Sequence, residues 1–88
     1  MPQIQRKDLP PALLQRLLDR IQERQIDARQ LELLARWLDG EPEVPEGPWY
    51  KRFPRMTVCG EGNLVKTFLL PGQAPNGTSV RWRILLSA

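Results

Sequence analysis

Histidine is absent from this chain of 88 residues, and cysteine occurs once, at Cys59. The sequence therefore lacks the commonest general base and the commonest metal ligand, and one thiol does not replace them. We predict no catalytic signature, no metal site and no cofactor. One cysteine also excludes a disulfide within the chain, and a lone thiol is more typical of a reducing cytoplasm than of an oxidising compartment.

Long apolar runs are missing as well. No stretch approaches the roughly 20 apolar residues that a membrane span needs, and the first eight residues lack the apolar core of a signal peptide. We expect a cytoplasmic protein with no membrane partner. A hydrophobic content of 41% with 26% charged residues is ordinary for a protein that folds. At this length we predict one small domain, residues 1–88, to which dimerisation would add stability.

Two helices are predicted before residue 40. Leucine and isoleucine recur at intervals of three and four residues between positions 13 and 21, which is the period of one apolar helix face. Asp8, followed by two prolines, marks the start of the first helix. Asp27, with Gln30 three residues later, marks the start of the second helix, and Gly40 marks its end. Residues 8–39 are therefore predicted to form a helical hairpin.

The second helix has two apolar faces. Leu33 and Trp37 point almost opposite to the side that would pack on the first helix, so they need either the sheet or a second subunit to cover them. We name these two residues as candidates for self-association. A helix-turn-helix DNA reader is disfavoured, because its second helix would expose them to the groove. The face toward the first helix comprises Ala28, Leu31, Leu34, Ala35 and Leu38.

The second half of the chain is predicted to be a sheet. Residues 40–48 carry three prolines and three glutamates and are predicted to be an extended connector. Strand-like runs follow at 55–59, 64–70 and 79–86, so residues 49–88 should form a three-stranded antiparallel meander, with 49–55 as the hinge that enters it. The predicted class is α+β, with the helical hairpin packed on the meander. A short strand at residues 1–7 is an open alternative.

Positive charge is concentrated in the strand half. Residues 49–88 hold six Lys/Arg against Glu61 alone, whereas residues 1–40 are nearly balanced. Such a surface can attract nucleic acid or an acidic protein partner. The competing interpretation is that the nearby aromatic side chains are core residues with solvated basic neighbours. The candidate binding residues are Tyr50, Lys51, Arg52, Arg55, Lys66, Arg81 and Arg83.

Two other patterns have plainer explanations. Arg16, Arg20 and Arg24 recur every four residues, but the acidic residues between them favour a solvated, ion-paired helix face over a phosphate track. The run Cys59-Gly60-Glu61-Gly62 is typical of a hairpin turn, since no base is available to activate the thiol.

Three functions remain open. The first is a non-enzymatic binding or regulatory module that uses the basic strand face. The second depends on residues 1–7 forming a strand, because the order strand, helix, helix and three strands is similar to that of RelE-type toxins. That likeness implies a ribonuclease acting through Tyr50, Lys51, Arg52, Arg55, Arg81 and Arg83, although element order alone does not fix function. The third is a dimeric structural protein with no nucleic-acid ligand.

Overall fold

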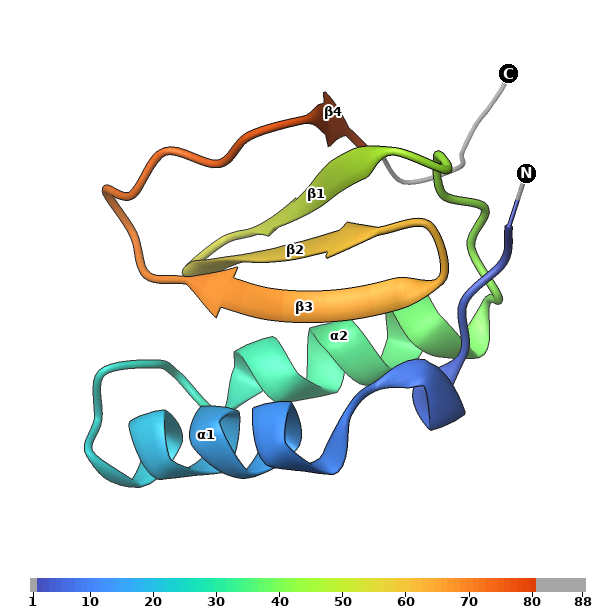
Figure 1. The fold of residues 1–88 in the computed structure, drawn as a ribbon. Coiled ribbons are helices and arrows are strands. Elements are labelled where there is room, and N and C mark those ends of the chain that lie inside the picture. The colour runs from blue at the N-terminus through green and yellow to red at the C-terminus, as the bar shows by residue number, and fades with distance from the viewer. Residues whose placement is uncertain (1, 81–88) are drawn as a thin grey trace, which may run out of the picture.

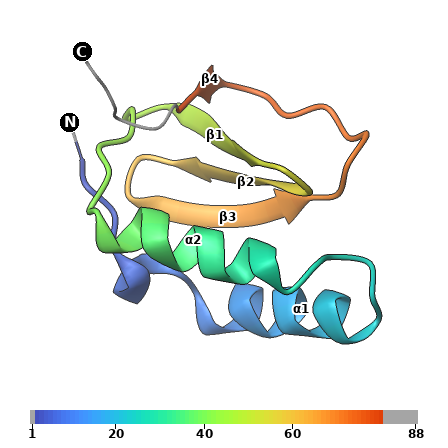
Figure 2. The ribbon, with the colours of Figure 1, turned by 180° about the vertical axis from the view of Figure 1, so that it is seen from behind.

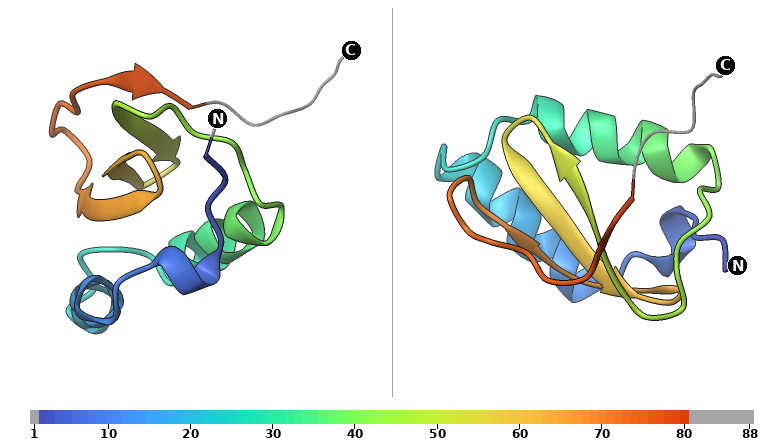
Figure 3. Two further views of the ribbon diagram at one scale, coloured as in Figure 1. Left: turned by 45° about the vertical axis from the view of Figure 1, so that its right-hand side comes forward. Right: turned by 90° about the horizontal axis from the view of Figure 1, so that it is seen from above.

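Two helices lie on one side of an antiparallel sheet in the computed structural model, which describes residues 2–80 (Figure 1). The predicted α+β class is confirmed, with a helical layer followed by a three-stranded antiparallel sheet. Helix α1 packs against β3 and helix α2 against β1, and the end-on view separates the two layers (Figure 3). The elements are a 3-10 turn η1 (Arg6–Asp8), α1 (Pro11–Gln22), α2 (Arg29–Asp39), β1 (Pro48–Phe53), β2 (Met56–Glu61), β3 (Leu64–Leu69) and β4 (Thr78–Ser79).

The first helix begins later than the sequence pattern indicated. Asp8 does not cap α1; its carboxylate accepts the backbone N–H of Gln5 at 2.8 Å and closes η1 instead. Pro10, in an extended conformation, is the residue before α1, and Pro11 opens the helix without losing a hydrogen bond. The apolar stripe is as expected, with Leu13 and Leu17 buried.

The second helix is joined to the β1–β2 turn by a buried amide. The Asp27 carboxylate accepts the N–H of Arg29, the first residue of α2, at 2.9 Å. Gln30 was expected to reach back to Asp27 as in a capping box. Its side chain is buried instead, and its Oε1 accepts the backbone N–H of Arg55 at 3.0 Å. This bond positions the turn between β1 and β2 against the start of α2.

The meander is confirmed, and β2 and β3 lie at the predicted runs 55–59 and 64–70, but its remaining strand is β1 and not the run predicted at 79–86. Strands β1, β2 and β3 pair antiparallel in sequence, so the stretch 49–55 is largely a strand and not a hinge. The reason is visible in β1, where Trp49, Lys51 and Phe53 alternate inward and are buried.

Strand β4 pairs with β1, at one edge of the sheet, whereas we expected the last strand to lie beside β3 at the other edge. Thr78 and Ser79 pair in parallel with Trp49 and Tyr50, and the chain reaches them from β3 by a long loop (Figure 3). The strand predicted at 79–86 would have extended the meander beside 64–70. Most of that segment lies outside the described residues.

The N-terminal arm pairs with the connector and not with the sheet (Figure 2). The Ile4 N–H donates to the Pro42 carbonyl at 3.1 Å, the Val44 N–H donates to the Pro2 carbonyl at 2.8 Å, and Gln3 forms a single bridge with Glu43. The side chains of Ile4 and Val44 are fully buried. Within residues 2–80 the arm is thus not a strand of the main sheet, and the element order on which the likeness to RelE-type toxins depended is not met.

Aromatic side chains hold the two layers together. The Trp37 ring meets the rings of Trp49 and Phe53 edge to face, with centroids 5.9 Å and 6.0 Å apart. Trp37 is only 3% exposed, and Leu33 packs against the same core. The sheet therefore covers the face that Leu33 and Trp37 present. Our assignment of these residues to self-association is corrected, because a buried Trp37 is not accessible to a second copy.

Gly60 provides a direct test of this packing. A Cβ at Gly60 would overlap the Trp49 ring and the Leu64 carbonyl. We expect Gly60→Ala to lower the free energy of unfolding by about 2 kcal/mol or more, measured by urea denaturation. Gly47→Ala is the matched control, since a Cβ there meets nothing within 4 Å; it should leave stability within about 1 kcal/mol of wild type. Equal effects of the two changes would contradict this packing.

Candidate functional site

The outward face of β1 carries two of the predicted binding residues. Tyr50 is half-buried, Arg52 is exposed, and the Arg52 guanidinium lies over the Tyr50 ring at 5.4 Å from its centroid. Since cation–π contacts at exposed sites are worth only about 0.5–1 kcal/mol, Arg52 can leave the ring for a ligand at little cost. These two residues do form a small basic and aromatic patch.

Lys51 points in the opposite direction, and its assignment to the binding surface is corrected. Its side chain is 3% exposed, with Nζ 5.4 Å from the centroid of the Phe53 ring and 3.4 Å from the Arg52 carbonyl oxygen, to which it donates. The pleat of β1 places every second residue inward, so Lys51 follows Trp49 and Phe53 into the protein. Burial lowers the pKa of the Lys51 ammonium.

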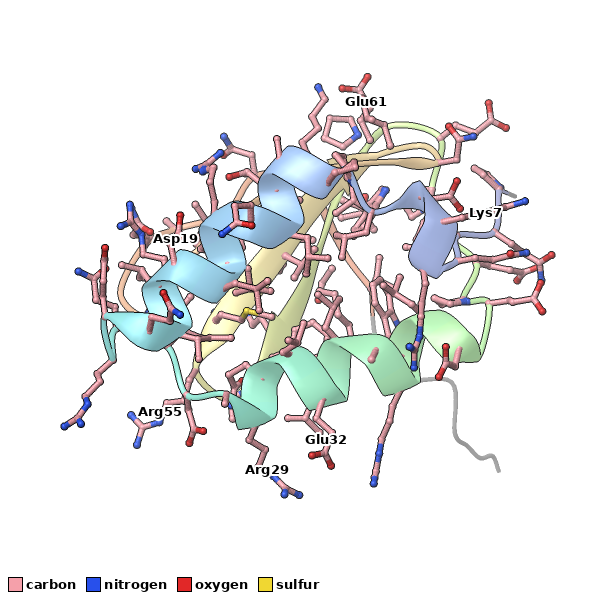
Figure 4. All side chains as sticks on the ribbon, turned by 90° about the horizontal axis from the view of Figure 1, so that it is seen from below. Lys7, Asp19, Arg29, Glu32, Arg55 and Glu61 are labelled. Atoms are coloured by element: carbon pink, nitrogen blue, oxygen red, sulfur yellow. The ribbon has the colours of Figure 1, made fainter. Side chains whose placement is uncertain are left out.

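The remaining predicted residues lie on β3, in the β1–β2 turn and outside the described residues. Lys66 is on β3 and forms an ion pair with Glu61 at 3.0 Å. Arg55 lies in the β1–β2 turn, at the opposite end of the hairpin from Glu61, and Figure 4 shows these two residues far apart. Arg81 and Arg83 lie outside the described residues. Within residues 2–80, the predicted basic strand face is therefore reduced, because Lys51 is buried and Lys66 is paired with Glu61.

Arg55 instead borders an open pocket at the end of the helical hairpin. The pocket has a volume of about 470 Å³ and lies where the α1–α2 connection, the β1–β2 turn and the segment after β3 meet. Two arginines, Arg24 and Arg55, provide its positive charge. We call this the hairpin-end pocket; it is lined by Ile21, Arg24, Gln25, Ile26, Asp27, Ala28, Arg55 and Pro71.

Arg24 reaches this pocket through an unusual backbone conformation. Its φ is 63°, in the left-handed region that glycine adopts most easily. The Gln25 N–H donates to the Arg20 carbonyl and the Arg24 N–H donates to the Ile21 carbonyl, so α1 ends in a Schellman motif. The sequence pattern had placed Arg24 on a solvated ridge with Arg16 and Arg20. In the sequence, one predicted helix ends and the next begins within a few residues, with no glycine between them. That pattern is the signal that would have identified Arg24 as a residue in the left-handed conformation.

Arg16 and Arg20 agree in part with the prediction of a solvated, ion-paired helix face. Arg20 pairs with Glu23 at 3.1 Å, as expected for a solvated helix face. The Arg16 guanidinium lies over the Phe68 ring at 5.7 Å and so covers the edge of the core.

Cys59 gives no sign of activation. It is half-buried opposite Tyr50 on the outward face, and burial raises the pKa of its thiol. Among residues 2–80 there is no group of three or more cysteine, aspartate or glutamate side chains placed to hold a metal ion. No helix in the described part of the chain is long and apolar enough to cross a membrane.

Comparisons of the chain with protein-family models, with curated proteins and with solved structures found no match. The function is therefore argued from the geometry of the sites themselves.

The buried Lys51 makes stability depend on pH. Its pKa in the folded protein lies below the ordinary lysine value of about 10.4, so the unfolded chain binds more protons in the pH range just below that value. The free energy of unfolding of the wild type should therefore rise with pH, relative to that of Lys51→Met, as the pH approaches about 10.4 from below. Parallel urea titrations of the two proteins measure this difference. A difference that stays constant or falls would refute the assignment.

Arg24 yields a second prediction. Glycine at this position removes the left-handed strain, so we expect Arg24→Gly to raise the free energy of unfolding by about 0.5–1 kcal/mol after allowance for the greater flexibility of unfolded glycine. Arg24→Ala keeps a Cβ in the same conformation and should not stabilise the protein. Thermal unfolding of both variants distinguishes relief of strain from mere loss of the arginine charge.

Proposed function

We propose that the protein is a non-enzymatic binding module that takes an acidic segment of a partner protein, with carboxylates bound by Arg24 and Arg55 in the hairpin-end pocket. The observation that carries this proposal is the pairing of two arginines from distant parts of the chain around one open cavity of about 470 Å³. Guanidinium groups bind carboxylates through paired, charge-assisted hydrogen bonds, which give direction as well as affinity.

The other lining residues are consistent with a peptide ligand. Ile21, Ala28 and Pro71 offer apolar surface beside the two arginines. Asp27 also lines the pocket, and its carboxylate already accepts the Arg29 N–H. A bound carboxylate is repelled from the Asp27 side and is thereby directed toward the arginines.

An acidic protein segment is favoured over nucleic acid by the distribution of charge. Binding to a phosphate backbone needs several cations in register along a strand or groove. In the described residues Lys51 is buried, Lys66 is paired with Glu61, and Arg52 lies over the Tyr50 ring on the outward face of β1. Two arginines in one pocket are sufficient for one or two carboxylates, but they do not form a track.

Fluorescence anisotropy with a labelled glutamate-rich peptide tests the proposal. We expect Arg55→Gln to weaken binding roughly fivefold or more at low salt, since it removes one of two guanidinium donors. Arg29→Gln is the matched control: Arg29 is exposed on α2 and does not line the pocket (Figure 4). Both variants lose the same charge, so a general electrostatic effect would weaken binding equally in each.

The same assay with single- and double-stranded oligonucleotides decides the partner class. We expect these to bind less tightly than the peptide at equal salt. Tighter oligonucleotide binding would overturn the choice of an acidic protein, and equal losses in Arg55→Gln and Arg29→Gln would overturn the pocket as the site.

A further inference from the structure

A buried glutamine occupies a position of α2 where the other buried side chains are apolar. Gln30 is 2% exposed, and the remaining buried residues of this helix are Leu34, Trp37 and Leu38. Glutamine is mostly found on protein surfaces, because burying its amide costs free energy unless the amide is hydrogen-bonded. A glutamine in this buried row therefore indicates a contact that an apolar residue could not make.

The contact that Gln30 makes is with the β1–β2 turn. Its Oε1 accepts the backbone N–H of Arg55 at 3.0 Å, and the two residues lie 25 positions apart in the chain. Arg55 lines the hairpin-end pocket, whereas Gln30 is not one of the lining residues. An effect of Gln30 on a ligand in that pocket would therefore be transmitted through Arg55.

The β1–β2 turn lacks the geometry that short hairpins prefer. Phe53 pairs with Met56, so Pro54 and Arg55 are the two residues of the turn. Turns of this length favour types I′ and II′, and both types require a positive φ at the first of the two positions. The proline ring fixes φ at about −65°, and the φ of Arg55 is not positive either. A turn of this kind gains from a contact that holds it from outside.

The Arg55 N–H is the group through which the turn can be held. The internal hydrogen bond of a β-turn joins the carbonyl of the first residue to the N–H of the fourth. Arg55 is the third residue of its turn, so its N–H takes no part in that bond and is satisfied by Gln30 instead. The bond thus joins the backbone that carries the Arg55 guanidinium to the first turn of α2, a few residues after Arg24.

We propose that Gln30 is the positioning residue of the hairpin-end pocket: its buried amide holds the β1–β2 turn against α2 and so keeps the Arg55 guanidinium at the pocket together with Arg24. This inference rests on the proposed function, because the ligand is the same acidic segment. Paired hydrogen bonds from a guanidinium to a carboxylate depend on direction, so they weaken when the supporting backbone shifts. Without the Gln30 bond, the ligand would have to order the turn as it binds, at a cost in affinity.

Amide hydrogen exchange followed by NMR tests the geometric part of the proposal. Gln30→Met keeps the length of the side chain and removes the acceptor, so we expect the Arg55 amide to exchange at least roughly tenfold faster than in the wild type. Gln30→Asn is a second variant, because its amide is one methylene shorter and falls short of the Arg55 N–H. Circular dichroism identifies the folded variants. Unchanged exchange of the Arg55 amide in either folded variant would overturn the proposal.

The glutamate-rich peptide assay separates positioning from a merely structural role. We expect Gln30→Met to weaken binding roughly threefold in the wild-type background and to have no effect in the Arg55→Gln background, because it acts through the Arg55 guanidinium. Leu34→Val is the matched control, since it perturbs the packing of the same buried row one turn further along α2. It should leave peptide binding by the folded protein unchanged.

The outcomes distinguish this proposal from the proposed function. If the wild type binds no acidic peptide, the proposed function fails, and the role of Gln30 in binding fails with it. If Arg55→Gln weakens binding and Gln30→Met does not, only the role of Gln30 is overturned. Equal weakening by Gln30→Met in the two backgrounds, or the same weakening by Leu34→Val, would identify a general loss of stability and would also overturn it.

Discussion

The packing of Trp49 against Trp37 is the contact on which the rest of the fold depends. The Trp49 indole lies directly over Gly60, and its N–H donates to the Gly62 carbonyl at 2.8 Å. One side chain of β1 thereby fixes the position of β2, the turn after it and helix α2 together. A ring that is fully buried needs a partner for its N–H, and the β2–β3 turn provides it. The N-terminal arm and the connector then cover the same core with Ile4 and Val44.

The inward position of Trp49 also determines where the basic residues go. The alternation of a strand is strict, so placing Trp49 and Phe53 in the core places Lys51 between them and sends Tyr50 and Arg52 outward. Packing of the aromatics outweighs the cost of burying one ammonium, whose pKa falls as a result. Charge density along the sequence therefore overstates the charge on any one face.

The local sequence pattern predicted the helices and most of the sheet. It could not predict contacts between residues that are far apart in the chain. The leucine period and the Asp27 and Gly40 signals indicated both helices, and of the two covers foreseen for Leu33 and Trp37, the sheet is the one found. Strand β1 was missed because its inward position 51 is a lysine, which conceals the alternation. The parallel pairing of Thr78 and Ser79 with β1, the pocket shared by Arg24 and Arg55, and the bond from Gln30 to Arg55 each join residues far apart in the chain. No local rule fixes such contacts.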